Sequence, residues 1–217
     1  MKEVLEQLKR FGTSTIGGVL DQLGIAGLVN PPIRGIAPGA SMVGTAFTVK
    51  NVTGELGTYK KEDFNMSSFI DGPVAGDILV IDAGGAAVSQ IGGVATTVLA
   101  KKGVAGVLID GGYRDHDEIA ATGIPFFARQ ALPISGKTRN KTLGVNGTVQ
   151  IGGVSVRAGD IILADSTGVV VVPRDRAEEV IAIAKEAEEF DERLMAAALK
   201  GHPLKECSRI AREKLEP

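Results

Sequence analysis

Apolar residues near the start of the chain recur at helical spacing. This pattern predicts a helix over 2–11, which Gly12 ends. A second helix is expected to begin at a cap of hydroxyl side chains, Thr13–Thr15, and to end at Gly24. The chain therefore opens with two short helices, and prolines then mark a loop.

The central part alternates between continuous apolar runs and amphipathic stretches. A run that is apolar throughout fits a strand covered on both faces. The predicted strands are 43–50, 77–81, 104–109 and 124–128, and the predicted helices are 94–102 and 114–121. Glycine pairs at 84–85, 92–93 and 111–112 are expected to form loops and turns between them. This alternation predicts an α/β fold.

The second half is predicted to hold short strands and then a long helix. The expected strands are 148–151, 154–157, 161–164 and 169–172, and the amphipathic helix spans 176–199. The segment 203–215 is also amphipathic. A single domain must cover these apolar faces somewhere, so we expect the chain to self-associate.

One stretch is echoed later in the chain. The run from Gly76 to Asp82 resembles the run from Gly159 to Asp165. We interpret both as equivalent Gly-Asp turns that lead into core strands. An ancient internal duplication is the alternative.

Composition narrows the function classes. A chain of 217 residues fits one domain, 1–217, better than two. Its 24 Lys and Arg against 26 Asp and Glu argue against nucleic acid or an anionic membrane as the main partner. The N-terminus is charged and amphipathic, and no apolar run approaches about 18 residues. We expect a cytoplasmic protein with no membrane partner.

Few residues can act as soft metal ligands or thiol nucleophiles. The single Cys207 cannot form an internal disulfide. His116 and His202 are the only histidines, which excludes a zinc site built from several His and Cys ligands. Any metal is therefore expected to be a hard cation bound by oxygen.

Two nucleotide-binding motifs can be tested directly. No two glycines are separated by a single residue, so the dinucleotide fingerprint Gly-x-Gly-x-x-Gly is absent. The run 131–138 fits a relaxed phosphate-loop pattern, but 139–144 lacks the apolar stripe of the helix that the motif requires. We interpret this run as a chance match.

The segment 110–118 is the strongest candidate for chemistry. Six acidic, basic or imidazole side chains fall within nine residues, directly after an apolar strand. Ligands of α/β proteins gather beyond the carboxyl ends of such strands. Arg114 suits a carboxylate, and Asp115 offers a hard oxygen ligand for a divalent cation. The alternative is that the acidic residues only decorate a helix N-terminus.

The segment 84–95 is a second candidate. Paired glycines before a helix expose unpaired N–H groups, which can seat a carboxylate or phosphate. Close packing of the helix on a strand, where no Cβ fits, is the alternative.

In order along the chain, several motifs resemble the ribonuclease E activity regulator A-like (RraA-like) family, which includes 4-hydroxy-4-methyl-2-oxoglutarate aldolases. The motifs are GDILVID from Gly76, IGG from Ile91, GVAGVLIDGGYRD from Gly103, GD at Gly159, and DSTGVVVVP from Asp165. The resemblance covers nearly the whole chain. It implies a compact β/β/α swivelling-type α/β domain with a long C-terminal helix, assembled as a homotrimer or hexamer.

The resemblance also implies a site. Asp115 matches the aspartate that holds Mg²⁺ or Mn²⁺ in aldolase members, and Arg114 matches the arginine that holds the pyruvate moiety. The backbone amides near Gly92, Gly93, Val94 and Ala95 hold the same moiety. A glutamate from a neighbouring subunit's C-terminal helix approaches the metal's waters, with Glu189 favoured over Glu188 and Glu192 by position.

The chain departs from the aldolase pattern at one position. Active aldolases carry Asp or Glu 21 positions before the arginine, and here that position is Gly93. The first hypothesis is a metal-dependent lyase, an aldolase or decarboxylase that acts on a small 2-oxo acid through a pyruvate enolate. The second is a non-catalytic regulatory or scaffold protein, which the missing carboxylate favours. A third is another metal-dependent reaction on a larger substrate.

Overall fold

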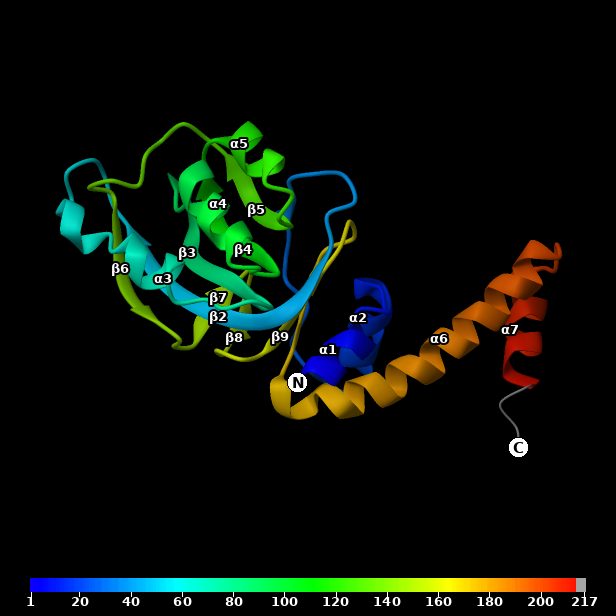
Figure 1. Cartoon of the computed structure of the whole chain (residues 1–217). Helices are drawn as coiled ribbons and strands as arrows, with labels where there is room; N and C mark the ends of the chain where they lie inside the picture. Colours follow the sequence, from blue (N-terminus) through cyan, green and yellow to red (C-terminus); the bar gives the residue numbers. More distant parts are fainter. Residues whose placement is uncertain (214–217) are drawn as a thin grey trace.

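The computed structural model describes residues 1–213 as a mixed α/β fold with a long C-terminal helix, as predicted (Figure 1). The predicted segment 203–215 therefore runs beyond the described residues. The helices are α1 (Lys2–Leu8), α2 (Thr13–Gln22), α3 (Met66–Ile70), α4 (Gly93–Lys101), α5 (His116–Ala121), α6 (Ala177–Leu199) and α7 (Leu204–Glu213), with short 3-10 turns at Lys61–Asp63 and Arg174–Arg176. The strands are β1 (Arg34–Gly35), β2 (Met42–Thr53), β3 (Asp77–Ser89), β4 (Gly106–Tyr113), β5 (Phe126–Ala131), β6 (Asn140–Val145), β7 (Val149–Ile151), β8 (Val154–Val156), β9 (Ile161–Ala164) and β10 (Val169–Val172).

The long strand β2 joins the parallel and antiparallel parts of one eight-stranded sheet. Strands β2 to β5 run parallel, and the order along the sheet is β1-β5-β4-β3-β2-β9-β10. The first residues of β2 pair with β9, and its last residues pair with β6. A hairpin, β7-β8, forms a separate two-stranded sheet. Because parallel strands end at one edge, the segments after β3, β4 and β5 lie near each other.

Three apolar clusters hold the layers together. Helices α3, α4 and α5 pack on one face of the parallel strands around Phe69, Leu99 and Ile119. The β7-β8 hairpin covers the other face. Helices α1, α2 and α6 pack on β9 and β10 in a third cluster (Figure 1). Burial at roughly 25 cal/mol per Å² of apolar surface makes these clusters the main stabilising term.

Two buried aspartates fasten the hairpin to the ends of the parallel strands. Asp82 on β3 pairs with Lys50 at 2.8 Å and accepts a hydrogen bond from the Gln150 N–H at 2.9 Å. Asp110 on β4 pairs with Arg129 and accepts from the Gly152 N–H at 2.7 Å. Each carboxylate thus pairs with one basic side chain and accepts a hydrogen bond from one backbone N–H of the hairpin. Burial of a charge is costly without such partners.

Two of the three glycine pairs lie inside strands and do not form the predicted loops and turns. Gly84 and Gly85 lie within β3 in the left-handed region, with φ of 60° and 77°, and pairing with β4 resumes after a register shift. The predicted turn at 111–112 is also wrong, because both glycines lie in β4. A Cβ at Gly112 would lie 2.7 Å from the Leu132 side chain, so close packing explains this glycine.

The repeated Gly-Asp turns are confirmed. Gly76 and Gly159 have φ of 88° and 87°. In each turn the aspartate accepts from a backbone N–H three residues back: Asp77 from Val74 at 3.0 Å, and Asp160 from Arg157 at 2.8 Å. The likeness therefore reflects one local turn geometry used twice.

The last helices form an arm that leaves the sheet (Figure 1). Helix α7 packs back on the end of α6. Met195, Leu199 and Leu204 on this arm are exposed by 61%, 82% and 75%. Among residues 1–213, no helix combines the length and apolar content needed to cross a membrane.

The start of α2 is capped from a distant hairpin, contrary to the prediction of a local hydroxyl cap. Asp165, between β9 and β10, accepts from the Thr13 N–H at 2.8 Å and the Thr13 hydroxyl at 2.7 Å, and also from the N–H groups of Thr167 and Gly168. Partial burial raises the pKa of Asp165, but these hydrogen bonds outweigh it, and the net pKa is lowered.

We expect Asp165→Asn to lower the free energy of unfolding by about 1–2 kcal/mol at neutral pH, because an amide cannot accept from all four donors. A lowered folded-state pKa stabilises above the unfolded value of about 3.9, and this contribution is lost as the pH falls through the folded pKa. Urea unfolding at about pH 7 and about pH 3 should show the difference from wild type shrinking at low pH. Asp21→Asn, on the exposed side of α2, is the control. A constant difference would contradict the assignment.

Candidate functional site

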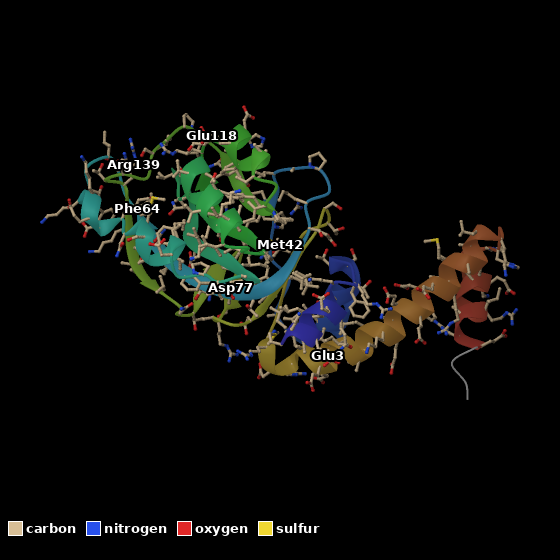
Figure 2. All side chains as sticks on the ribbon, viewed as in Figure 1. Glu3, Met42, Phe64, Asp77, Glu118 and Arg139 are labelled. Carbon is tan, nitrogen blue, oxygen red and sulfur yellow. The ribbon has the colours of Figure 1, made fainter. Side chains whose placement is uncertain are left out.

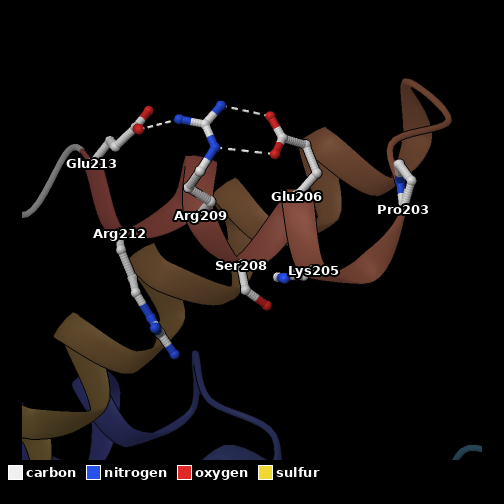
Figure 3. Close-up of a pocket in the computed structure, with 7 residues that line it drawn as sticks. All are labelled: Pro203, Lys205, Glu206, Ser208, Arg209, Arg212 and Glu213. Carbon is white, nitrogen blue, oxygen red and sulfur yellow. Dashed lines mark hydrogen bonds and ion pairs between the residues drawn. The ribbon is translucent and has the colours of Figure 1, made fainter.

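The candidate site lies where the loop after β4 meets the N-terminus of α4. A hollow of about 390 Å³ is lined there by residues of three segments: Met66, Ile70, Gly92, Val94, Arg114 and Asp115. A larger hollow lies on the outside of α7. In that hollow Arg209 pairs with both acidic residues that line it, Glu206 and Glu213 (Figure 3), and α7 lies away from the sheet (Figure 1). The chemistry points to the smaller hollow.

A sharp turn directly after β4 determines where Arg114 and Asp115 lie. The Arg114 N–H donates to the Ile91 carbonyl at 3.2 Å, which ties the loop to the start of α4. Asp115 then adopts the left-handed region, with φ of 59° and ψ of 47°. Aspartate tolerates this region better than most residues, at a cost of order 1 kcal/mol. The strained turn aims both side chains at α4.

One oxygen of Asp115 is engaged, and the other is available. Oδ2 accepts from the Gly93 N–H at 3.1 Å and lies 3.4 Å from the Arg114 Nε. Oδ1 takes part in no hydrogen bond within residues 1–213. The side chains of Arg114 and Asp115 are 45% and 32% exposed, so both can be reached from the hollow.

Because the two glycines at the start of α4 have no side chains, the loop that carries Arg114 and Asp115 can approach the helix closely. A Cβ at Gly92 would lie 2.3 Å from the Asp115 Oδ2 and 3.0 Å from the Arg114 Nε. A Cβ at Gly93 would lie 1.9 Å from the Glu118 Oε2. Both glycines are therefore required by close packing, but what packs on them is the charged loop and α5, and not a strand as the alternative expected.

The N-terminus of α4 still offers hydrogen-bond donors. The Gly93 N–H is used by Asp115, and the Thr96 N–H donates to the Gly92 carbonyl at 3.1 Å. The N–H groups of Val94 and Ala95 have no acceptor within the described part of the chain, as expected for the first turn of a helix. Together with Arg114, they can hold a carboxylate beside Asp115.

Asp115 is the residue of this site that could hold a hard divalent cation, because it presents a free carboxylate oxygen. Within residues 1–213, no group of three or more His, Cys, Asp or Glu side chains is placed so that it could hold a metal ion by itself. Mg²⁺ commonly keeps several waters and is held by one or two carboxylates, so such a sparse site suits Mg²⁺ or Mn²⁺ and not zinc.

A buried tyrosine anchors the loop from behind. The Tyr113 hydroxyl lies 2.7 Å from the His116 Nδ1, and its ring packs 5.0 Å from the ring of Phe126. Burial raises the pKa of Tyr113, so the phenol keeps its proton at neutral pH. This bond fixes the first turn of α5 and the loop before it.

Sequence reasoning missed one segment of the site. Ser135 and Lys137 line a small hollow of about 50 Å³ that Arg114 and Gly92 also line. Rejection of a phosphate loop here is confirmed, because strand β6 follows instead of a helix, and Thr138 has a φ of 60°. The cluster of lysine and arginine at 137–141 was the available signal.

The structure does not bring the C-terminal glutamates to the site within one chain. Glu188, Glu189 and Glu192 lie on α6, which runs away from the sheet (Figure 1). None of them lines the hollow at Asp115. A contribution from α6 would have to come from another copy.

Comparison with known proteins identifies a matching family and relatives that align with most of the chain. The family model RraA-like (aldolase/RraA) matches residues 13–171. The protein DlpA of Legionella pneumophila is 30% identical over 210 residues; these cover 95% of this chain, which spans only 33% of the length of DlpA. A protein of Halalkalibacterium halodurans named as a candidate 4-hydroxy-4-methyl-2-oxoglutarate aldolase is 30% identical over 191 residues, with 88% of this chain and 86% of that protein covered.

A solved structure agrees with the fold. RraAS2 of Streptomyces coelicolor, described as an unusual member of the RNase ES inhibitor RraA protein family, matches with a TM-score of 0.80 and 26% identity. The match covers 88% of this chain and 94% of that one.

Proposed function

The chain belongs to the RraA-like family, and from that premise we propose that it is a divalent-metal-dependent lyase, of the aldolase or decarboxylase type, acting on a small 2-oxo acid. The observation that carries the proposal is the convergence of Arg114, Asp115 and the free amides of Val94 and Ala95 on one hollow. A cation ligand and carboxylate donors side by side suit a substrate with a carboxylate next to a ketone.

Each residue of the proposed site has a separate role. Arg114 binds the substrate carboxylate through its planar fork, and the amides of Val94 and Ala95 hold the same group from the other side. Asp115 would hold Mg²⁺ or Mn²⁺, which when bound supplies Lewis acidity for the ketone oxygen. The Gly93 N–H fixes the Asp115 carboxylate, at 3.1 Å from Oδ2. The left-handed turn keeps the arginine and aspartate in one orientation.

The proposal includes assembly into a homotrimer or hexamer. Val94 is 81% exposed on the rim of the hollow, and the arm carries its own exposed apolar side chains. Exposed apolar side chains at these two places support contact with another copy of the chain. In such an assembly α6 of a second copy brings Glu189, or Glu188 or Glu192, toward the site. Light scattering that finds only monomer at micromolar concentration would refute this part.

The activity test uses the purified protein with Mg²⁺ or Mn²⁺. Release of pyruvate from 4-hydroxy-4-methyl-2-oxoglutarate or from oxaloacetate is expected, and chelation should stop it. No turnover of either substrate, beside an active control aldolase, would reject the lyase proposal.

A non-catalytic regulator is the second candidate. Gly93 favours it, because the aldolase pattern has an acidic side chain at that position, and the relative RraAS2 is described as belonging to an RNase inhibitor family. Calorimetric titration with Mn²⁺ separates the two, since a scaffold has no use for the cation. Absence of Mn²⁺ binding would favour the regulator.

Arg114→Lys tests the carboxylate clamp. The substitution keeps the charge but loses the two-donor fork, so the Kd for pyruvate or the KM for substrate should rise by about 10-fold or more. Mn²⁺ binding and the melting temperature should stay near those of wild type. Arg10→Lys, an exposed residue after α1, is the matched control. An unchanged affinity for pyruvate would show that Arg114 is only a surface charge.

A further inference from the structure

A hollow lined by basic side chains lies within the C-terminal arm. It has a volume of about 150 Å³ and lies between the end of α6 and α7. Figure 2 shows the arm far from Glu118, which marks the side of the molecule that holds the candidate active site. The hollow is therefore separate from that site. Of the described residues that line it, three are basic and none is acidic: Arg193, Ala196, Ala197, Lys200, His202 and Ile210.

Arg193 lacks the partners that a buried guanidinium needs. Its Nε and Nη2 atoms are buried, and neither donates a hydrogen bond within residues 1–213. A buried charged group without a partner is costly, because it loses its contacts with water and gains none in return. The hollow that Arg193 lines has room for the missing acceptor.

Nε and Nη2 form the edge of a guanidinium that binds oxyanions side-on. Arg209 on α7 shows this edge in use, because its Nε and Nη2 donate to the two carboxylate oxygens of Glu206 at 3.0 and 2.5 Å (Figure 3). Two parallel N–H groups of this kind match the spacing of carboxylate oxygens. The same edge of Arg193 meets no such group in the described part of the chain.

The charge of the hollow indicates which anion fits. Arg193 and Lys200 supply two positive charges, and the His202 ring adds nitrogens that can form hydrogen bonds. Glu206 lies near His202 but is already paired with Arg209. A single carboxylate would leave one positive charge unbalanced, whereas a dianion balances both. Since one water needs about 10–15 Å³, the hollow has room for a small dicarboxylate.

We infer that Arg193, Lys200 and His202 form a binding site for a small dianionic oxyanion, of the dicarboxylate class, between α6 and α7. Arg193 takes one carboxylate through Nε and Nη2, and Lys200 takes the other. The ligand joins the two helices of the arm, because Arg193 lies on α6 and His202 lies in the turn that leads into α7. The inference is independent of the proposed function, since it needs neither a metal nor Arg114.

Calorimetric titration of the full chain with malonate, without divalent cations, tests the site. Arg193→Gln removes the charge and the two-donor edge, and should raise the Kd for malonate by about 10-fold or more. Arg209→Gln removes an arginine of the same arm whose edge is already occupied, and should leave the Kd within about 2-fold of wild type. Arg114→Gln should also leave this binding in place, because Arg114 belongs to the other hollow. Circular dichroism checks that each variant folds.

Two further readouts do not depend on the arginine variants alone. Acetate carries one carboxylate, so it should bind at least about 10-fold more weakly than malonate. Bound malonate should slow amide hydrogen exchange in α7 of the wild type, because it holds this helix to α6, and should not do so in Arg193→Gln.

Several outcomes would overturn the site. These are no malonate binding by wild type, binding that Arg193→Gln leaves unchanged, binding that Arg209→Gln or Arg114→Gln weakens as much, and acetate binding as tight as that of malonate. If wild type binds no malonate and Arg193→Gln forms a smaller oligomer, the missing acceptor is an acidic side chain of another copy, and the small-anion site is wrong.

Discussion

Asp115→Asn is expected to abolish Mn²⁺ binding and metal-dependent turnover while the fold persists. The substitution removes the charge of the proposed ligand but keeps its shape, and asparagine tolerates the left-handed conformation that this position requires. We expect the Kd for Mn²⁺ to rise roughly 100-fold or more, which corresponds to about 2.7 kcal/mol of binding free energy. Isothermal titration and a pyruvate-release assay measure the two effects.

Ligand binding by this variant separates the two interpretations of Asp115. If Asp115 serves only the N-terminus of α5, Asp115→Asn leaves ligand binding intact. Asp115→Ala should cost about 1 kcal/mol in either case, because alanine is strained at a φ of 59° and the Gly93 N–H loses its acceptor. Wild-type Mn²⁺ and pyruvate binding by Asp115→Asn would place the site elsewhere.

Gly92→Ala should damage the site by steric conflict alone. The backbone of Gly92, with φ of −139°, accepts any residue, but the new Cβ would lie 2.3 Å from the Asp115 Oδ2. The loop must move, so we expect loss of both Mn²⁺ and pyruvate binding and a fall of about 1–3 kcal/mol in the free energy of unfolding. Calorimetry and urea unfolding test both.

Gly18→Ala is the matched control for this substitution. Gly18 is exposed in the middle of α2, and nothing lies within 4 Å of the position of its Cβ. Alanine there should stabilise the protein by about 0.5–1 kcal/mol, because it restricts the unfolded chain and favours the helix. If Gly92→Ala binds Mn²⁺ as well as Gly18→Ala does, the packing account of Gly92 is wrong.

The alternation of apolar runs predicted the elements that build the sheet, because a strand buried on both faces has a clear apolar signature. It failed where glycine lies inside a strand. Gly84 and Gly85 are typical of a loop in the sequence. In the structure β3 continues through their left-handed conformations, and its pairing register with β4 shifts there. Strand β6 was missed, since Asn140 to Val145 has no regular alternation of apolar and polar residues.

The candidate site was predicted in part. Arg114 and Asp115 stand out because charged residues follow an apolar strand in the sequence. The contact between Glu118 and Gly93 depends on how α4 and α5 pack across a separation of 25 positions, and no local pattern reports such packing. The same reason explains why the cap of α2 by Asp165 could not be predicted: its partners are 152 residues apart.

The third apolar cluster sets an order of events during synthesis. The stripe of Leu8, Ile16 and Leu20 on α1 and α2 is completed only by β9, β10 and α6, which end well over a hundred residues later. At about 5–20 residues per second, the ribosome delivers those partners roughly 10 to 30 s after the first helices emerge. Throughout that interval the nascent N-terminal helices expose their apolar side to the cell, where chaperones bind such surfaces. The apolar stripe on α1 and α2 is thus among the last parts of this fold to be covered.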